Sequence, residues 1–318
     1  MKGSYTVFIQ NNKLRYEFTI NRNITIIRGD SSTGKTTILN MLNEYITAGR
    51  SSGIQVKCDK ACRILAGMYW KNDLSVMKES LVFIDECNDF VYTDDFAKAV
   101  KASDCYFIII TREDLPNLPY SVNEVYGLRV SNKYAGIKQC YNEMFGLYGK
   151  YALATENNAD VIIVEDSNSG YDFFKHIASE GKICISAQGK SNIYRMLQER
   201  NTEKVLVIAD GAAFGCEMEH IRQLIESGND IVLYLPESFE WLVLKSGVID
   251  GAETMLDNPG NFIESSQYVS WERFFTDVLV QKTKGTYLQY SKKKINPAYL
   301  NDKVKNEIIT TKRCPSLL

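Results

Sequence analysis

Apolar and polar residues alternate near the start of the chain, and apolar residues later gather into short runs separated by helical patterns. The stretches YTVFI and LRYEFTI, with NNK between them, predict a β-hairpin. The clearest helical stripe spans residues 36–47, with a single apolar face. Further strands are expected where β-branched and other apolar residues run together, over 23–28, 54–58, 81–85 and 105–111.

This alternation predicts an α/β domain over residues 1–145, with helices covering both faces of a parallel sheet. Two more strands, over 124–130 and 134–140, are expected to complete it. Gly, Ala and Asn become frequent after residue 145, so we expect the domain to be followed by a helix and a linker at 146–157.

A second alternation predicts another parallel α/β domain, Rossmann-like, over residues 158–280. Gly181 stands where a helix C-cap is expected, and a further helix is predicted over 271–280. The four expected strands are the runs VIIVED, KICISAQ, KVLVIAD and DIVLYLP.

A glycine-bounded loop joins the predicted strand 23–28 to the predicted helix 36–47, and it matches the pattern G-x-x-x-x-G-K-[ST]. Backbone N–H groups of such a loop, together with the helix N-terminus, cradle a polyphosphate. Lys35 would reach the β- and γ-phosphates, and Thr36 would offer its hydroxyl to Mg²⁺. The sequence therefore predicts binding of ATP and Mg²⁺. The predicted nucleotide-binding residues are Gly29, Asp30, Ser31, Ser32, Thr33, Gly34, Lys35, Thr36 and Thr37.

A second polar group is expected at the tips of two later strands. Asp85 follows the apolar run LVFI and would help to hold Mg²⁺, while Glu86 is placed to polarise an attacking water. Thr111, at the end of the run CYFIIIT, would sense the γ-phosphate. Glu86, Lys35 and Thr111 are therefore the predicted catalytic residues of an ATPase.

A GTP-binding alternative rests on the residues TRED, 111–114, which are close to the guanine-recognising pattern [NT]KxD. The DxxG pattern of GTPases does not follow Asp85, which favours ATP.

Together the hairpin, the phosphate loop, the Asp85-Glu86 pair and the Thr111 tip resemble the ATPases of the ABC and AAA superclass over about the first 145 residues. The chain lacks an LSGGQ-type signature, and the segment between its two nucleotide motifs is short, so ABC-type dimerisation across ATP does not carry over. A homo-oligomer, with an arginine from another subunit at the phosphates, stays open.

The stretches 161–165, 186–193 and 205–215 resemble a TOPRIM domain, in the version found in overcoming-lysogenisation-defect-type nucleases, where an ATPase domain precedes it. The resemblance covers roughly residues 158–240. It implies that Glu165 and Asp210 bind Mg²⁺ for phosphodiester chemistry, because hard divalent cations prefer several carboxylate oxygens.

One position departs from this pattern, because the second Asp of the family's DxD motif falls on Ala212. Asp166 and Glu217 are candidate substitutes. Three interpretations stay open for the second domain: an ATP-regulated, metal-dependent nuclease, a degenerate TOPRIM-like fold that serves as a binding module, and an unrelated Rossmann-like domain.

Composition and charge limit where in the cell the protein is expected to act. The 318 residues carry a net charge of −2 and no apolar run near the roughly 20 residues that span a bilayer, and the start lacks a signal-peptide pattern, so no membrane association and a cytoplasmic location are expected. Eight cysteines without a CxxC pair are interpreted as buried thiols in a reducing compartment. Residues 281–318 hold nine Lys and Arg against two Asp and Glu, which predicts a basic tail that binds nucleic acid or an acidic surface, or is merely solvated.

The expected function is that of an ATPase which couples its nucleotide state to a TOPRIM-like domain acting on nucleic acid or a protein partner. A regulated nuclease, a non-catalytic nucleotide sensor and a GTP-binding protein are the alternatives.

Overall fold

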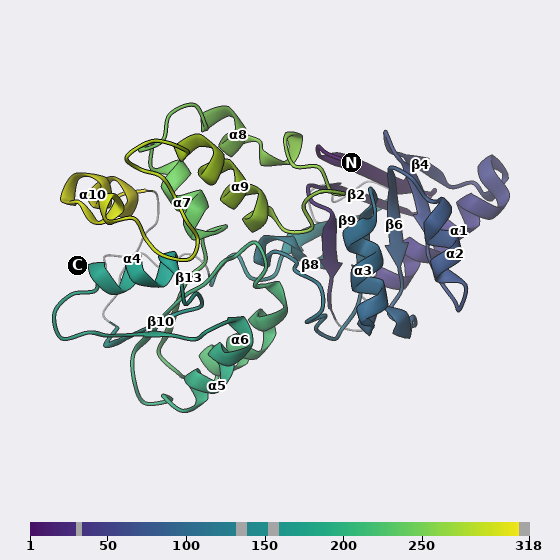
Figure 1. Ribbon diagram of the computed structural model, residues 1–318. Helices are drawn as coiled ribbons and strands as arrows, with labels where there is room; N and C mark the ends of the chain where they lie inside the picture. The colour runs from purple at the N-terminus through teal and green to yellow at the C-terminus, as the bar shows by residue number, and fades with distance from the viewer. Residues whose placement is uncertain (30–33, 132–138, 152–158, 312–318) are drawn as a thin grey trace. The chain divides into compact units, whose positions relative to one another are not determined.

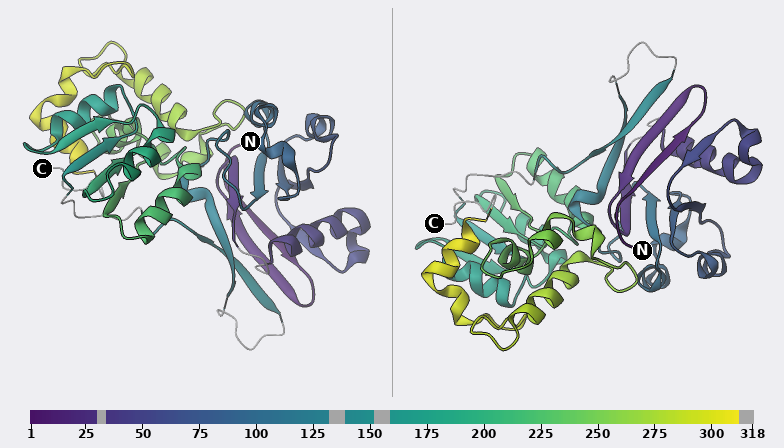
Figure 2. Two further views of the ribbon diagram at one scale, coloured as in Figure 1. Left: turned by 90° about the horizontal axis from the view of Figure 1, so that it is seen from below. Right: turned by 90° about the horizontal axis from the view of Figure 1, so that it is seen from above.

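The computed structural model describes residues 1–29, 34–131, 139–151 and 159–311 (Figure 1). The chain forms two compact units. Unit 1 comprises Met1–Leu147 and Pro259–Val269, and unit 2 comprises Tyr148–Asn258 and Ser270–Leu318. Both units combine helices with sheets, which confirms the predicted α/β class (Figure 2).

The described strands of unit 1 form one curled, nine-stranded sheet in the order β4-β1-β2-β9-β8-β3-β7-β6-β5. Its strands are β1 (Tyr5–Gln10), β2 (Leu14–Ile20), β3 (Ile24–Ile27), β4 (Gln55–Lys57), β5 (Ala61–Ile64), β6 (Ser80–Ile84), β7 (Tyr106–Ile110), β8 (Val125–Ser131) and β9 (Cys140–Gly146). The α-helices of unit 1 are α1 (Lys35–Ala48), α2 (Trp70–Val76) and α3 (Asp94–Ala102), and its 3₁₀ helices are η1 (Gly49–Ser52), η2 (Asp89–Tyr92), η3 (Val122–Glu124) and η7 (Pro259–Asn261).

The sheet is mixed, whereas the sequence predicted a parallel one. Strands β8, β3, β7, β6 and β5 run parallel as neighbours, but β1 pairs antiparallel with both β2 and β4, and β8 pairs antiparallel with β9. The predicted hairpin is confirmed, with Tyr5 opposite Ile20 and Gln10 opposite Arg15. A connection as short as NNK can join only antiparallel strands, so this part of the sheet could not follow the parallel pattern.

Helix α1 packs against one face of this sheet. Its side chains Ile38 and Leu42 are fully buried in a cluster that also takes residues from β1, β2, β3, β6 and β7. The helix matches the predicted stripe over 36–47 closely. The core of unit 1 therefore lies directly beneath the helix that follows the glycine-bounded loop.

Strand β9 is shifted along the chain from its predicted position at 134–140, of which residues 134–138 lie outside the described residues. Residues 140–146, where the linker was expected to begin, continue the strand because they pair with β8 as far as Tyr126 opposite Gly146. Polar residues such as Asn142 and Glu143 weaken the apolar signal of this strand. The edge strand β5 was not predicted, whereas α2 and α3 lie in intervals where helical patterns were expected without stated bounds.

Residues 259–269 belong to unit 1, although the sequence pattern predicts that they belong to the second domain. Backbone hydrogen bonds join Gly3 N–H to Gly260 O (2.7 Å) and Ser265 N–H to Met1 O (3.0 Å). The Asn23 side chain donates to Val269 O (3.0 Å). Unit 1 is therefore discontinuous in sequence.

Unit 2 contains a four-stranded parallel sheet in the order β11-β10-β12-β13, as the alternating pattern predicted. The strands are β10 (Val161–Val164), β11 (Ile183–Ser186), β12 (Val205–Ile208) and β13 (Ile231–Tyr234). The α-helices are α4 (Ser169–Ile177), α5 (Ile193–Gln198), α6 (Met218–Glu226), α7 (Phe239–Lys245), α8 (Glu253–Asp257), α9 (Trp271–Thr283) and α10 (Asp302–Ile309), with 3₁₀ helices η5 (Lys190–Asn192), η6 (Gly215–Glu217) and η8 (Pro297–Leu300).

Two local expectations for unit 2 are corrected. Helix α4 ends at Ile177 because Ala178 is extended, so Gly181 (φ +92°) lies in the following turn and is not the C-cap. The segment predicted as a basic tail is folded as far as residue 311. It contributes α10 and the buried side chains of Leu288, Tyr290 and Tyr299.

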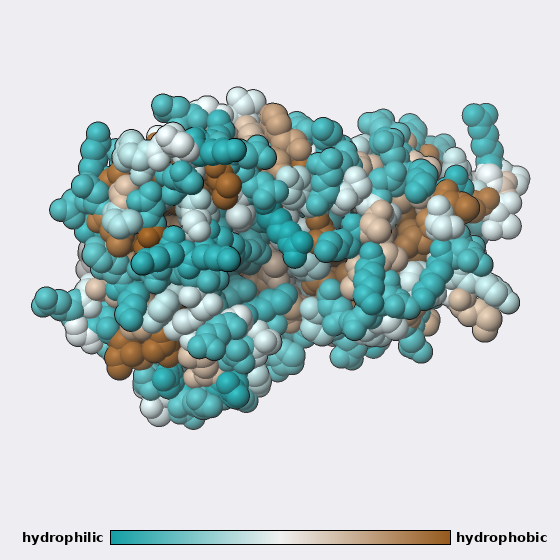
Figure 3. Space-filling view, in the orientation of Figure 1, coloured by the Kyte–Doolittle hydropathy of each residue, from teal (hydrophilic) through white to brown (hydrophobic). Residues whose placement is uncertain are grey.

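Within the described ranges, no helix is both long and apolar enough to cross a bilayer. Figure 3 shows one face of the molecule, on which hydrophilic residues predominate and apolar ones form small separate patches.

Gly211 follows β12 at a point where two backbones approach closely. A Cβ atom at this position would lie 2.6 Å from Leu235 O and 2.9 Å from Pro236 O. We expect Gly211→Ala to lower the free energy of unfolding by about 1–3 kcal/mol, because the backbone must shift to admit the methyl group. Urea unfolding measures the loss.

Gly149→Ala is the matched control for this substitution, since no atom lies within 4 Å of the added Cβ. Equal stability of the two variants would contradict the close approach.

Candidate functional site

Three parallel strands of unit 1 end side by side, and the predicted nucleotide-binding residues follow the carboxyl ends of these strands. Strand β7 lies between β3 and β6, with Ile27 opposite Ile110 and Ile84 opposite Ile109. The residues that follow these strands therefore emerge side by side, and they include Gly29, Thr111 and Asp85. Strand β8 borders β3 on its other side and runs parallel to it.

The start of α1 requires glycine at position 34. Gly34 adopts the left-handed conformation (φ 88°, ψ 6°), and a Cβ atom there would lie 2.8 Å from the Tyr16 hydroxyl. That hydroxyl donates a hydrogen bond to the Gly34 carbonyl (3.2 Å). The first turn of α1 contains no acidic residue, so the positive end of the helix dipole is not offset from within the helix.

Lys35 is the first residue of α1 and is buried, with 5% of its surface exposed. Its ammonium group donates a hydrogen bond to the Gly29 carbonyl and so closes the loop on itself. Thr36 is exposed, and Thr37 is half-buried. The other predicted phosphate-loop residues, Asp30, Ser31, Ser32 and Thr33, lie outside the described residues.

Asp85 and Glu86 follow β6 and are both half-buried. The Asp85 carboxylate accepts a hydrogen bond from the Glu86 N–H (2.8 Å). The Glu86 carboxylate receives two bonds from the Arg112 guanidinium, at 3.1 and 3.3 Å. The predicted water-polarising group is therefore held by an arginine that is not among the predicted site residues.

Thr111 is buried, with 1% exposure, directly after β7. Its N–H donates to Ile27 O (3.2 Å), and its hydroxyl accepts from the Glu113 N–H (3.0 Å) and lies 3.4 Å from the Tyr92 hydroxyl. The hydroxyl stabilises its own turn. A γ-phosphate-sensing role for Thr111 stays a prediction.

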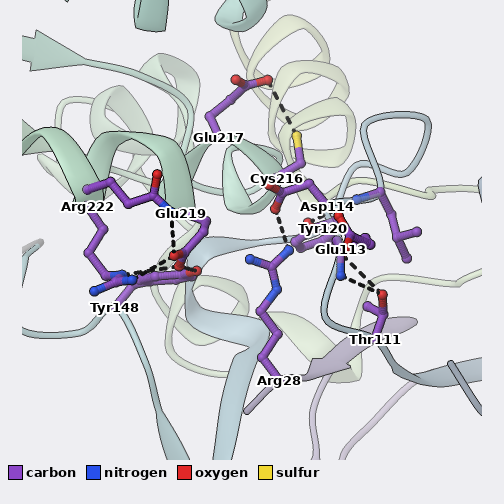
Figure 4. A network of polar contacts seen from close by, with 12 residues as sticks. Arg28, Thr111, Glu113, Asp114, Tyr120, Tyr148, Cys216, Glu217, Glu219 and Arg222 are labelled. Carbon is purple, nitrogen blue, oxygen red and sulfur yellow. Dashed lines mark hydrogen bonds and ion pairs between the residues drawn. The ribbon is translucent and has the colours of Figure 1, made fainter. Parts of the chain in front are cut away.

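Arg28 is the residue just before the glycine-bounded loop, and two contacts hold it in place (Figure 4). Its buried side chain forms an ion pair with Asp114, and its N–H donates to Tyr126 O in β8 (2.7 Å). No local pattern reveals this pair, because its members are 86 residues apart. Asp114 is also the carboxylate that the guanine-recognising alternative requires, and Arg28 engages it.

In unit 2 the two predicted metal ligands lie close together. Glu165 follows β10 and Asp210 follows β12, which is the parallel neighbour of β10. The Glu165 carboxylate accepts the Asp210 N–H (2.9 Å). Both residues line a cavity of about 20 Å³, room for roughly one water molecule, together with Glu240 and Lys292.

Burial dominates the electrostatics of this cavity. It raises the pKa of Glu165 to about 7 and the pKa of Asp210 well above its usual range, and Glu272 adds to both effects. Glu240, also buried, accepts a hydrogen bond from the Tyr290 hydroxyl (2.9 Å).

Lys292 is the cation among these acids, and it forms an ion pair with Glu272. Burial lowers its pKa, but the carboxylates of Glu272, Glu240 and Asp210 outweigh that effect, so the pKa is raised and the ammonium stays charged. Lys292 comes from the segment predicted as a tail, and its backbone carbonyl accepts from the N–H of Ser169 at the start of α4 (3.2 Å).

These residues do not fit a divalent cation. Asp166 already accepts the N–H groups of Ser167 (2.7 Å), Asn168 (3.1 Å) and Gly170 (3.0 Å). Over the part of the chain that the structure describes, no three His, Cys, Asp or Glu side chains are arranged to hold a metal ion. The geometry therefore does not favour Mg²⁺ at Glu165 and Asp210, since Lys292 supplies positive charge there.

No family model matches the chain, and no curated protein matches its sequence. Support for its function therefore comes from the residues and their arrangement.

We expect the stability of unit 2 to depend on pH through Glu165. Its folded-state pKa of about 7 lies above the ordinary value of 4.5, so its contribution is fully present below about pH 4.5 and is lost as the pH rises through 7. The free energy of unfolding should fall relative to that of Glu165→Gln by up to about 3 kcal/mol over this interval. Urea unfolding, followed by tryptophan fluorescence at a series of pH values, measures the difference.

Glu199→Gln, at an exposed carboxylate of unit 2, is the control and should track the unchanged chain at every pH. A pH-independent difference between the unchanged chain and Glu165→Gln would contradict the raised pKa.

Proposed function

We propose that unit 1 binds and hydrolyses ATP, and that unit 2 is a binding module for nucleic acid or a protein partner whose engagement responds to the nucleotide. The observation that carries the proposal is the sequence Gly34-Lys35 opening α1 at the sheet edge where Asp85, Glu86 and Thr111 also emerge.

The proposed phosphate-binding role follows from the positive charges at the carboxyl ends of these strands. The N-terminus of α1 and the buried Lys35 ammonium both favour a polyphosphate. Lys35 would exchange its bond to the Gly29 carbonyl for bonds to the β- and γ-phosphates. Thr36 and Asp85 would hold Mg²⁺, which neutralises negative charge on the phosphates.

Glu86 is the group that would orient and polarise the attacking water. Its partner Arg112 is 54% exposed, and an ion pair as accessible as this one contributes no more than about 1 kcal/mol. The pair can therefore open at low cost and release Glu86 toward a water. The same closed pair is also what a non-catalytic nucleotide sensor would show, and the measurement of turnover below separates the two.

We propose that the bound nucleotide carries adenine and not guanine. A carboxylate that reads guanine must be available to the base, whereas the Asp114 carboxylate pairs with the buried Arg28 guanidinium. Displacing it would leave Arg28 buried without its counter-charge, which is costly.

The binding role of unit 2 is favoured over a metal-dependent nuclease because Lys292 stands among the carboxylates that would ligate the metal. Exposed lysines of the same segment, Lys284, Lys293 and Lys294, present positive charge to solvent and suit contacts with phosphate groups.

The first test concerns ATP binding by the full chain. We expect Lys35→Met to weaken binding by about 10- to 100-fold, the effect of losing charge-assisted hydrogen bonds worth about 1.5–3 kcal/mol. Isothermal titration calorimetry measures the affinity. Lys101→Met, at an exposed lysine in α3, is the control and should bind as tightly as the unchanged chain. Equal affinity of both variants would overturn the phosphate-binding role of Lys35.

The second test concerns hydrolysis. We expect Glu86→Gln to retain ATP binding and to lower kcat by about 100-fold or more, the usual contribution of a positioned general base. Release of inorganic phosphate measures the rate. Glu143→Gln is a matched control, because Glu143 also forms an exposed ion pair with an arginine, Arg129 (2.8 Å), in unit 1. If the unchanged chain binds ATP without turnover and Glu86→Gln alters nothing, the sensor function holds.

A further inference from the structure

A groove lies between helices α2 and α3 on one face of the large sheet. Helix α2 connects β5 to β6, and α3 connects β6 to β7. Because these strands are parallel neighbours, right-handed connections place both helices on the same face. The first turns of the two helices meet, with the ring centroids of Trp70 and Phe96 5.7 Å apart. Alongside this contact the helices leave a cavity of about 430 Å³.

Small side chains on α3 keep this space open. Ala99 and Ala102 line the groove one helical turn apart, and Ser103 follows them. The large apolar residues of the same helix, Phe96 and Val100, are buried in the core instead. Neighbouring helices ordinarily fill the space between them with interlocking side chains. The alanines therefore leave room that a ligand can occupy.

The apolar part of the lining is already packed in place. Helix α2 contributes Trp70 and Leu74, and Met77 follows the helix. The Trp70 ring stacks on Phe90, with 5.0 Å between centroids, and meets Phe96 edge to face. A surface whose rings are fixed in this way needs little rearrangement to receive an apolar group, which reduces the entropy cost of binding.

Lysines give the groove a positive charge. Lys71, Lys78 and Lys98 line it and are all exposed. Asp95 is the one acidic residue among the described lining residues, and it forms an ion pair with Lys71. Within the described ranges no acidic side chain forms an ion pair with Lys78 or Lys98. The excess positive charge favours an anionic ligand.

We propose that this groove binds a small amphipathic anion, a ligand with an apolar body of a few rings and a carboxylate, sulfonate or phosphate group. The apolar body would lie against Trp70, Leu74 and Met77. The acidic group would contact the ammonium groups of Lys78 and Lys98. A volume of about 430 Å³ is typical of a site for a small molecule.

The groove is distinct from the candidate nucleotide site. None of its described lining residues is among the predicted nucleotide-binding or catalytic residues. An extended nucleic-acid strand is a less suitable occupant, because such a strand requires positive charge along a longer path. The proposal therefore does not depend on ATP binding by unit 1.

The test uses the full chain and anilinonaphthalene sulfonate as the probe. This compound combines fused apolar rings with an anionic group and fluoresces more strongly when bound in apolar surroundings, so a fluorescence titration measures its affinity. The uncharged phenylnaphthylamine has the same rings without the sulfonate, and we expect it to bind at least about tenfold more weakly. Equal affinity for the two compounds would overturn the proposal.

Two variants locate the bound probe. Lys98→Glu reverses a charge of the groove and should weaken binding of the probe at least about tenfold. Ala99→Leu should abolish binding, because the larger side chain fills the cavity and the open groove admits it without disturbing the core. Lys101→Glu, at an exposed lysine of α3 outside the groove, is the matched control and should bind the probe like the unchanged chain. Binding that neither Lys98→Glu nor Ala99→Leu weakens would contradict the proposal.

Two further measurements exclude other modes of binding. Lys35→Met should leave the affinity for the probe unchanged, whereas a loss of binding in this variant alone would assign the probe to the phosphate loop and overturn the proposal. Polyglutamate, an acidic chain without apolar groups, should not displace the probe. Displacement would show that an acidic polypeptide occupies the groove through charge alone, which would equally refute a site for a small amphipathic anion.

Discussion

The parallel pairing of β3, β7 and β6 is the constraint on which the candidate nucleotide site depends. Every residue of these three strands is buried, so apolar packing on both faces fixes their register. A shift of one residue would turn each side chain to the opposite face. Because the register is fixed, the carboxyl ends of the three strands lie side by side. The residues that follow them, Gly29, Thr111 and Asp85, therefore lie at the same end of the sheet. The chemistry proposed for unit 1 therefore rests on the packing of isoleucine, valine and phenylalanine.

The features that could be predicted from sequence are those encoded in adjacent residues. Strand β3, the loop after it and α1 form one continuous pattern, and so do the alternating strands and helices of unit 2. Short apolar runs and glycine positions carry this information because burial and the left-handed conformation of Gly34 are local demands. The phosphate-loop motif is visible for the same reason.

The remaining features depend on partners distant in sequence. Arg28 finds Asp114, and Lys292 finds Glu272 and Glu240, through the fold and not through spacing. A run of lysines near the end of a chain is typical of a solvated tail, and nothing local marks one of them as the cation of a buried acidic cluster. The position of β9 was missed because pairing with β8, and not its own apolar content, makes it a strand.

The discontinuity of unit 1 bears on how the chain acquires its structure during synthesis. A ribosome that has released residues 1–147 has not yet made the segment 259–269, which supplies acceptors for Gly3 and Asn23. Domains generally fold as units in the order in which they emerge, but here the first unit cannot complete its hydrogen bonding until most of the second has been translated. Maturation of unit 1 is thus tied to the appearance of unit 2.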